Sequence, residues 1–478
     1  MQLELREIPH APELHRLAAR LAHQPGLVWL HSLGVADAQS RYSLLTARPF
    51  LTVRTRGTRC ELRAGSRRHT QFGNPWALLD HLLSRYEMLD GRDLPFPAGG
   101  CFGYFGYELK NFSEPRLPRR AVDDLELADA QLGFHDSLVI QDRLLQKTWI
   151  LSTGLRVDGS RSRAAASAAV DFWRTQMDAI AAAPAPAQAP EESVAAEVVS
   201  NLRREEFLGA VVRALAYIRA GDIYQVNLSQ RFSTPWRRTG WELFDALCRH
   251  SAAPFAAYLN CGGLEIASSS PERFFRLSGA HAQTRPIKGT RPRGPDADSD
   301  ARLAHELQTS AKENAELVMI TDLLRNDLGR ICEFGSVAVP ELARLERFPQ
   351  VQHLVATVEG RLRPGTSHLQ ALRECFPGGS ITGAPKIRAM EIIDELEPVT
   401  RGPYTGAIGY LGFNRESQFS IAIRTALVRE RMAWFQTGAG IVADSDPEAE
   451  HNETLAKAGG FFAAVQPTHT LTTPSPKP

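Results

Sequence analysis

The sequence predicts a large α+β fold, and three observations support that class. Segments with helical periodicity and segments with strand-like patterns are interleaved along the chain, but without the regular period of a βαβ protein. The chain has 478 residues, of which 43% are hydrophobic and 23% charged, so it can bury a large core. A proline- and alanine-rich segment near residue 184 separates an N-terminal part from a longer C-terminal part.

The N-terminal part, residues 1–183, mixes helix and strand patterns. Residues 14–22 have the apolar spacing of a short amphipathic helix, and the alanine-rich residues 161–183 also favour a helix. Strands are predicted where apolar residues alternate or run together, at residues 26–32, 51–55 and 137–142.

The segment Pro184-Ala-Pro-Ala-Gln-Ala-Pro190 cannot continue a helix and has little apolar bulk to bury. We therefore predict a linker over residues 184–200. The C-terminal tail, residues 466–478, is rich in proline and threonine, a composition that favours disorder.

The C-terminal part, residues 201–465, has a denser pattern of elements. Helices are predicted from the apolar spacing at residues 203–219, 302–328, 385–396 and 447–465. Strands are predicted at residues 223–232, 264–270, 406–412 and 419–424. We expect the last two strands to lie in one sheet.

Charge and cysteine usage exclude several functional classes. There are 55 Lys and Arg residues against 54 Asp and Glu, and this balance argues against nucleic acid or an anionic membrane as the main partner. The six cysteines are scattered without a Cys-x-x-Cys pair, so neither a zinc site nor a disulfide framework is indicated. The N-terminus is charged rather than apolar, and no run of about 18 apolar residues occurs. A reducing cytoplasm fits these features.

The segment Arg285-Pro-Ile-Lys-Gly-Thr-Arg-Pro-Arg-Gly294 is the most informative part of the chain. Lys288 lies in it between a proline turn and a Gly-Thr pair, close to three arginines. Positive charge nearby and burial both disfavour the protonated form of an amine, and an unprotonated amine is a nucleophile. The arginines offer forked donors to carboxylates. The pattern indicates covalent chemistry on a small acidic substrate, with a solvated basic turn as the alternative.

Two predicted helices carry pairs of carboxylates at one-turn spacing. Glu313 and Glu316 share one helix face, and Glu450 and Glu453 share another. Two such faces across a cleft would form an oxygen-rich site of the kind that Mg²⁺ prefers. The alternative is a solvated acidic face with neighbouring lysines as salt-bridge partners.

Three single residues each allow two interpretations. Glu272 follows a predicted strand and could act as an acid or base, although the local sequence favours a surface glutamate. His353 lies in an apolar run, where a histidine is usually a satisfied core residue. Arg424 has apolar neighbours, so its guanidinium needs an anion, either from the protein or from a substrate.

Two glycine-rich segments add weaker signals. Residues 378–386 lead into a predicted helix, whose first amides could receive an anion. Gly438 and Gly440 lie in Thr437-Gly-Ala-Gly-Ile-Val442 and would let backbone N–H groups approach a ligand closely. Both segments could equally be plain helix caps and tight turns.

Taken together, these segments resemble the chorismate-utilising enzymes. The resemblance covers nearly the whole chain and is strongest between residues 221 and 457. It rests on the strings Gly221-Asp-Ile-Tyr-Gln-Val-Asn-Leu-Ser-Gln-Arg-Phe232, Ser270-Pro-Glu-Arg-Phe274, Pro286-Ile-Lys-Gly-Thr-Arg-Pro-Arg293, Asp322-Leu-Leu-Arg-Asn-Asp327, Pro377-Gly-Gly-Ser-Ile-Thr-Gly-Ala-Pro-Lys386, Ile421-Ala-Ile-Arg-Thr425 and Glu450-His-Asn-Glu-Thr454. It implies a large two-sheet β core flanked by helices, in which the N-terminal part is interleaved with the C-terminal part, residues 201–465 forming the catalytic region.

Within the family, the residue at position 288 separates two branches. Members that form anthranilate usually have alanine in Pro-Ile-x-Gly-Thr, whereas members that form 4-amino-4-deoxychorismate for 4-aminobenzoate and folate synthesis resemble this chain in having lysine there. The strings Leu30-His-Ser32 and Ser40-Arg-Tyr42 also resemble the second branch. The resemblance therefore implies amination of chorismate at C4, with anthranilate formation or a non-catalytic tryptophan-binding role as alternatives.

The resemblance also implies roles for individual residues. Lys288 would attack C2 of chorismate and expel the C4 hydroxyl, ammonia would then displace the lysine by attack at C4, and Glu272 would shuttle protons. Glu316 and Glu453 would hold Mg²⁺, which would bind the ring carboxylate and assist the leaving hydroxyl. Glu313 and Glu450 would support the metal. Arg424, Tyr404 and the amides around Gly438 and Gly440 would bind the enolpyruvyl carboxylate. Thr290 and His353 would contact the ring.

Two partners are implied as well. None of the six cysteines lies in a Gly-x-Cys-x-Gly nucleophile turn, so ammonia is expected from a separate glutamine amidotransferase subunit. Some members of the family hold a tryptophan, and the positions that would match are Ser32, Gln39, Ser40, Arg41, Tyr42, Pro254, Phe255 and Ala256.

Overall fold

The computed structural model describes residues 3–34, 36–37, 39–88, 93–182, 197–347 and 351–465. The predicted tail, and the predicted linker up to residue 196, lie outside the described residues, and the boundary between the two parts stays a prediction. No helix in the described part of the chain is both long and apolar enough to span a bilayer.

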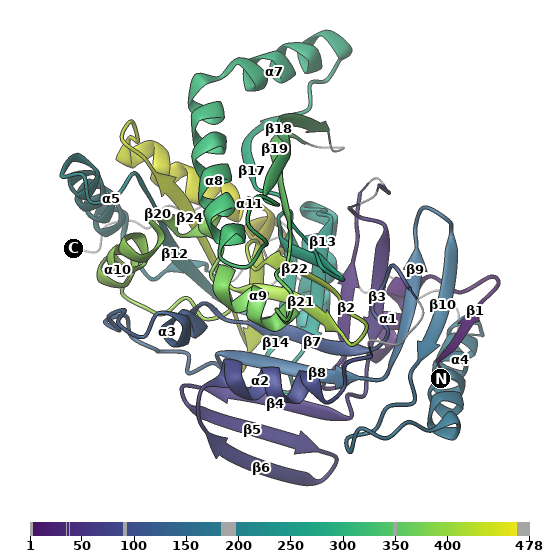
Figure 1. Ribbon diagram of the computed structural model, residues 1–478. Helices are drawn as coiled ribbons and strands as arrows, with labels where there is room; N and C mark the ends of the chain where they lie inside the picture. Colours follow the sequence, from purple (N-terminus) through teal and green to yellow (C-terminus); the bar gives the residue numbers. More distant parts are fainter. Residues whose placement is uncertain are drawn as a thin grey trace.

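Two large antiparallel sheets dominate the described residues (Figure 1). The first sheet contains strands from both ends of the sequence. Its order is β1 (Glu4–Glu7), β10 (Lys147–Ser152), β9 (Ser137–Asp142), β3 (Tyr42–Thr46), β2 (Val28–His31), β13 (Phe255–Asn260), β14 (Glu265–Ser270), β23 (Thr425–Arg429), β24 (Met432–Ile441), β12 (Gln225–Pro235) and β11 (Val199–Ser200), with β20 (Gly383–Ala384) paired to β12.

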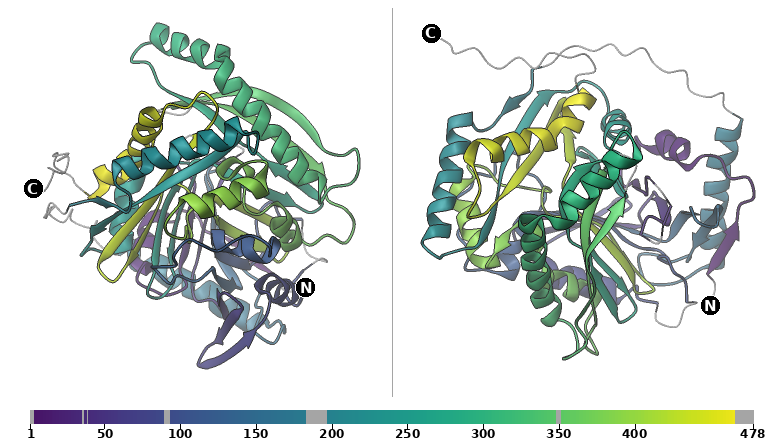
Figure 2. Two further views of the ribbon diagram at one scale, coloured as in Figure 1. Left: turned by 90° about the vertical axis from the view of Figure 1, so that its left-hand side faces the viewer. Right: turned by 90° about the horizontal axis from the view of Figure 1, so that it is seen from above.

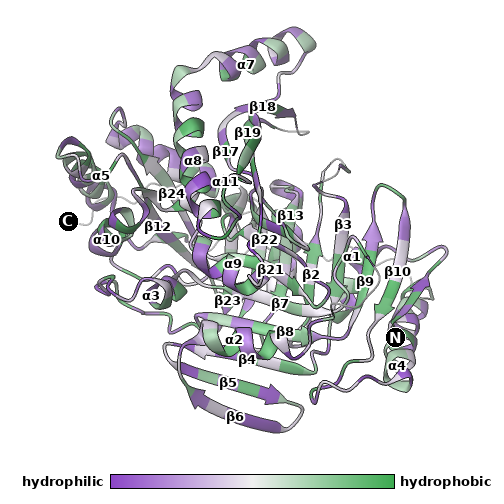
Figure 3. Cartoon of the chain, in the orientation of Figure 1, coloured by the Kyte–Doolittle hydropathy of each residue, from purple (hydrophilic) through white to green (hydrophobic). Residues whose placement is uncertain are grey.

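The second sheet also combines strands from the N-terminal and C-terminal parts of the sequence. Its order is β17 (Ile287–Pro292), β19 (Val351–Arg361), β16 (His281–Thr284), β15 (Arg273–Ser278), β22 (Glu416–Ile421), β21 (Ala407–Gly412), β7 (Gly100–Phe105), β8 (Ala130–His135), β4 (Leu51–Arg56), β5 (Arg59–Ala64) and β6 (Arg67–Phe72), with β18 (Ala338–Arg347) paired to β19. The edge strand β6 is largely hydrophilic (Figure 3), and charged edges discourage pairing with another chain.

The two parts of the chain meet within each sheet. N-terminal β2 pairs with C-terminal β13, and N-terminal β7 pairs with C-terminal β21. The implied fold, a two-sheet α+β structure with interleaved parts, is therefore confirmed.

Strand periodicity explains how the layers pack. Because alternate side chains of a strand point to opposite faces, each sheet can bury both of its faces. On β13, Ala257 and Leu259 pack between the sheets, whereas Tyr258 points to a helical layer. The inner layer also contains Phe102 and Ile408 from the second sheet. The result is a helix–sheet–sheet–helix sandwich.

Helices cover the outer faces of the sandwich, as the side and top views show (Figure 2). Those on the first sheet are α1 (Leu14–Leu21), α4 (Arg163–Ala181), α5 (Arg204–Arg219), α6 (Gly240–His250), α10 (Lys386–Leu396) and α11 (Pro447–Val465). Those on the second sheet are α2 (Pro75–Ser84), α8 (Ala311–Gly329) and α9 (His368–Cys375). The remaining helical segments are η1 (Tyr107–Leu109), α3 (Lys110–Ser113), α7 (Ala297–Thr309) and η2 (Gly379–Ile381).

One predicted helix is wrong. The single helix expected over residues 302–328 is divided into α7 and α8, which meet at an angle (Figure 1). Ser310 separates them because its backbone is extended (φ −64°, ψ 111°) and its hydroxyl accepts a hydrogen bond from the N–H of Glu313 (3.3 Å). Ser310 and Glu313 have the spacing of an N-terminal cap, a signal that the apolar periodicity concealed.

Candidate active site

A cavity of about 530 Å³ lies beside strands β12, β17, β19 and β24, and helices α8 and α11 supply part of its wall. It brings together every residue that the sequence assigned to catalysis, substrate binding or metal binding. These are Glu272, Lys288, Thr290, Glu313, Glu316, His353, Tyr404, Arg424, Gly438, Gly440, Glu450 and Glu453. Their individual roles stay predictions, but their convergence from segments as much as 181 residues apart makes this cavity the candidate active site.

Lys288 reaches the cavity from an irregular strand. The register between β17 and β19 shifts between Lys288 and Thr290, because Gly289 is an extra residue with φ 66°. A side chain at Gly289 would place its Cβ 2.6 Å from Leu307 and 3.1 Å from the carboxylate of Glu313. Glycine therefore permits both the bulge and the close approach of the acidic helix.

The three arginines near Lys288 do not behave as the sequence suggested. They were expected to offer their guanidinium groups to a substrate, but each one is paired with a carboxylate of the protein. The pairs are Arg285 with Glu346 (2.7 Å), Arg291 with Glu313 (3.3 Å) and Arg293 with Asp300 (2.7 Å). Lys288 itself lies 3.8 Å from Glu316, measured from Nζ to Oε2. Among these three arginines, only Arg291 lines the cavity.

Glu272 is a buried group rather than the surface glutamate that its local sequence favoured. Its residue is 7% exposed, and its Oε1 accepts a hydrogen bond from the hydroxyl of Ser380 (2.7 Å). Burial raises the pKa of Glu272 to about 7, although the Ser380 hydrogen bond and the charge of Lys288 act in the opposite direction. A carboxyl group that titrates near neutral pH can both donate and accept a proton during a reaction.

This burial predicts a pH-dependent effect of Glu272→Gln on stability. The native pKa of about 7 is above the ordinary value of 4.5, so burial of the ionised form increasingly destabilises the fold as pH rises between these values. The shift corresponds to about 3 kcal/mol in full. We expect Glu272→Gln to be more stable than the natural protein by up to about this amount at pH 8, and to lose most of the advantage at pH 5.

Calorimetric melting at the two pH values measures this difference. The exposed-glutamate variant Glu448→Gln serves as the control and should show no such trend. An equal gain for Glu272→Gln at both pH values would contradict the assignment of the shift to this carboxyl group.

His353 and Thr290 form a polar pair in the cavity wall. Oγ1 of Thr290 lies 2.8 Å from Nδ1 of His353, on neighbouring strands. Burial, with the charge of Arg424 as the second cause, lowers the pKa of His353 to about 4, so its imidazole is neutral near pH 7. A neutral imidazole can hydrogen-bond to a hydroxyl group without adding charge to the site.

The four carboxylates line the cavity from two helices, although Glu453 is exposed and has the lysine partner that a solvated acidic face would have. Glu453 is paired with Lys457 (2.6 Å), as Glu313 is with Arg291. Glu450 accepts a hydrogen bond from Ser445 on Oε1, while its Oε2 is buried without a hydrogen-bond partner in the described part of the chain. Burial raises the pKa of Glu450.

The donor set fits a hard cation. Within the described residues no three His, Cys, Asp or Glu side chains form a complete metal centre. The unsatisfied oxygen of Glu450 is nevertheless a position where a cation would compensate a buried acceptor. The four groups are oxygen donors, and no cysteine lines the cavity, which suits Mg²⁺ rather than a softer metal.

Arg424 adds a positively charged guanidinium to the cavity that the four carboxylates line. The predicted strand at residues 419–424 is too long, because β22 ends at Ile421 and Arg424 lies in a left-handed turn with φ 48°. Burial lowers the pKa of Arg424. No ion pair or hydrogen bond joins its guanidinium to another described residue, which favours a ligand over a protein carboxylate as its anion.

Sequence comparison decides the family to which these residues belong. The sequence model of the chorismate binding enzymes matches residues 41–463.

The chain belongs to this family.

Two relatives with different names are about equally similar to this chorismate binding enzyme. Aminodeoxychorismate synthase component 1 of Klebsiella aerogenes is 41% identical over 448 residues, which is 93% of this chain and 95% of that protein. Anthranilate synthase component 1 of Acetivibrio thermocellus is 39% identical over 450 residues, 91% of this chain and 89% of that protein. The resemblance seen in the sequence is confirmed, but overall identity does not separate the two reactions.

Solved structures agree on the fold. The anthranilate synthase component I from Streptococcus pneumoniae has a TM-score of 0.77 at 28% identity and covers 91% of this chain and 94% of its own. The menaquinone-specific isochorismate synthase MenF from Escherichia coli has a TM-score of 0.69 at 18% identity and covers 97% and 95%.

Two polar residues of this chorismate binding enzyme received no role from the sequence: Asn227, which lines the cavity, and Gln225, which lies two residues before it and beside Gly440. Gln225 and Asn227 lie on β12, and Oε1 of Gln225 and Oδ1 of Asn227 are buried without a hydrogen-bond partner among the described residues. A Cβ on Gly440 would lie 2.6 Å from Nε2 of Gln225 and 3.9 Å from Nζ of Lys288. The signal that could have identified them is the alternation of polar residues in a strand with apolar neighbours.

The positions proposed for tryptophan are only partly brought together. Six of them line a separate cavity of about 210 Å³, namely Ser32, Arg41, Tyr42, Pro254, Phe255 and Ala256. Gln39 and Ser40 do not line it, because Gln39 donates to Glu346 (3.1 Å) and Ser40 to Asp37 (2.9 Å). Arg41 is paired with Asp142 (2.7 Å).

Proposed function

We propose that this chorismate binding enzyme is an aminodeoxychorismate synthase component 1, which converts chorismate and ammonia into 4-amino-4-deoxychorismate. The observation that carries the proposal is the amine of Lys288 in the candidate active site, at the position where anthranilate-forming members usually have alanine. An amine in this cavity can bond to the ring of the substrate, whereas an alanine cannot.

The first half of the reaction forms a covalent adduct. The Nζ atom of Lys288 bonds to C2 of chorismate, the ring double bonds shift, and the C–O bond at C4 breaks. Glu272 gives a proton to the departing hydroxyl, which leaves as water. Thr290 and His353 contact the ring near that hydroxyl.

The second half releases the lysine. Ammonia bonds to C4, the double bonds shift back, and the bond between C2 and Nζ of Lys288 breaks. Glu272 takes the proton that ammonia loses, so both the amine and the carboxyl group return to their starting states.

Charge in the cavity orients the dianionic substrate. Arg424, Tyr404 and the backbone near Gly438 and Gly440 receive the enolpyruvyl carboxylate. The residues that would hold Mg²⁺ are Glu316 and Glu453, supported by Glu313 and Glu450. When bound, the ion supplies positive charge for the ring carboxylate and for the leaving hydroxyl.

Ammonia would come from a glutamine amidotransferase subunit, because none of the cysteines lies in a nucleophile turn of the glutaminase type. The relatives named component 1 are consistent with a second component. Binding of tryptophan in the 210 Å³ cavity stays a prediction.

Product analysis tests the proposed function. The protein is incubated with chorismate, Mg²⁺ and ammonium, and the products are separated by mass spectrometry. We expect 4-amino-4-deoxychorismate, which a lyase converts to 4-aminobenzoate. Fluorescent anthranilate as the main product would favour anthranilate synthase component 1 instead, and the absence of chorismate turnover would favour a non-catalytic ligand-binding role.

A further inference from the structure

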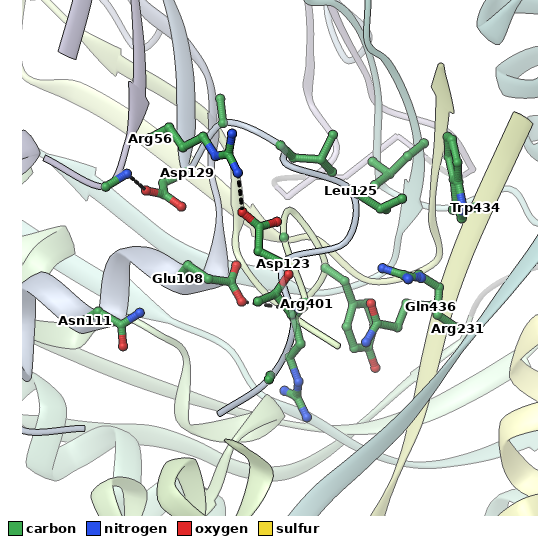
Figure 4. Close-up of a pocket in the computed structure, with 18 of the residues that line it drawn as sticks. Arg56, Glu108, Asn111, Asp123, Leu125, Asp129, Arg231, Arg401, Trp434 and Gln436 are labelled. Carbon is green, nitrogen blue, oxygen red and sulfur yellow. Dashed lines mark hydrogen bonds and ion pairs between the residues drawn. The ribbon is translucent and has the colours of Figure 1, made fainter. Parts of the chain in front are cut away.

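A second and larger cavity shares part of its wall with the candidate active site. Its volume is about 670 Å³, and Tyr404, Phe435 and Gln436 line both cavities. Residues of β4, β5, η1, β23 and β24 also line it. Figure 4 shows Arg56, Glu108, Trp434 and Gln436 among these residues. The exposed residues Arg54 and Arg119 belong to its lining, so it reaches the surface at a different place from the active site.

Strand geometry places this cavity next to the active site along β24. Alternate residues of a strand point to the same side. On β24, Gly440 and Gly438 line the active site, Gln436 lines both cavities and Trp434 lines the second one. Gln436 is four residues from Gly440, or about 13 Å along the strand. Gln436 therefore lies between the second cavity and the part of the active site that contains Gly440 and Lys288.

Two acids lie on one side of the second cavity (Figure 4). Glu108 lines the cavity and accepts a hydrogen bond on Oε1 from the backbone N–H of Arg401 (3.0 Å). Burial is the main cause that raises the pKa of Glu108 to about 7, and Lys110 opposes it. Burial also raises the pKa of Asp129 to about 6. A carboxyl group with such a pKa can take up and release protons near neutral pH.

The shared wall presents polar groups that remain available. The residue Tyr404 is 5% exposed, and its hydroxyl makes no hydrogen bond to another described residue. Gln436 donates its Nε2 to Ser229 (3.0 Å), which leaves the amide oxygen as an acceptor. Most arginines of the cavity are neutralised in pairs, namely Arg56 with Asp123, Arg59 with Glu61, Arg231 with Asp124 and Arg401 with Glu397.

We propose that the second cavity is the ammonia entrance of the same reaction, and that Glu108 accepts a proton from ammonium in it. This rests on the proposed function, which requires ammonia as the second substrate. One N–H bond of ammonium breaks and its electron pair stays on nitrogen, while an O–H bond forms on Glu108. The proton returns to solvent through the mouth of the cavity. Neutral ammonia moves past Gln436 and Tyr404 toward C4 of the bound ring.

Two variants test the entrance. Glu108→Gln keeps an acceptor for the N–H of Arg401 but removes the base, and Ala121→Phe narrows the cavity from its wall. With ammonium chloride as nitrogen donor, we expect kcat/KM for ammonium to fall about 10-fold in each, while KM for chorismate stays within about twofold. The Lys288 adduct, detected by mass spectrometry of the intact protein without ammonium, should form as in the natural enzyme.

Matched controls come from the same loop. Val122 and Glu126 are exposed and do not line the cavity, so Val122→Phe and Glu126→Gln should leave ammonium use unchanged. Unchanged ammonium use in both test variants, or an equal loss for ammonium and chorismate, would overturn the proposal. If the natural enzyme forms anthranilate, the proposed product is refuted. The proposed entrance is still supported in that case if Glu108→Gln weakens the use of ammonium. If the natural enzyme incorporates no nitrogen, both proposals are refuted.

Discussion

Lys288→Ala is expected to lower the rate of 4-amino-4-deoxychorismate formation by about 10³-fold or more, because removal of a covalent nucleophile closes the two-step route. Any residual turnover should shift toward direct substitution at C2. Chorismate affinity should change much less, because Arg424 and the backbone near Gly438 remain in place. Product analysis and single-turnover kinetics measure these effects.

The control for Lys288→Ala is Lys312→Ala, which removes an exposed lysine from the same cavity. It should change the rate by less than about threefold, as is usual for an exposed charge. Two results would show that the lysine is not the nucleophile. One is a wild-type rate of aminodeoxychorismate formation by Lys288→Ala. The other is a mass spectrum in which the natural protein carries no covalently bound substrate.

Glu316→Gln and Glu453→Gln should each reduce Mg²⁺-dependent turnover by more than about 100-fold, because a neutral amide replaces a hard anionic ligand. Titration calorimetry should show the same loss in Mg²⁺ binding, independent of catalysis. Glu448→Gln is the matched control on the same helix, since Glu448 is paired with Arg204 at the surface. Full activity of the natural enzyme or of either variant in the presence of a chelator would contradict the metal site.

The members of the site could be predicted from the sequence because they lie in short strings with distinctive chemistry. Lys288 is flanked by glycine and proline, and the glutamates of α8 and α11 recur at one-turn spacing. Their convergence in one cavity is what the family resemblance implied. Most helices and strands were also predictable, because each buries a face with a clear period.

Other features depend on contacts that a single sequence does not reveal. Arg285 was expected to serve a substrate, but its partner Glu346 is 61 residues away and comes close only when β18 pairs with β19. The left-handed turn at Arg424 follows apolar residues that read as a continuing strand. The second cavity combines wall segments from both parts of the chain, so it exists only after the sheets have packed.

The strand pairs β2–β13 and β21–β7 have a consequence for cooperativity. Cutting the chain between α4 and β11 would remove one of the two neighbours of four strands: β2 and β7 in one fragment, β13 and β21 in the other. Each fragment would then expose backbone donors and acceptors along two open edges, which favours aggregation. Co-expression, in which each fragment can cover the other's edges, is therefore the way to make a two-piece form of this enzyme.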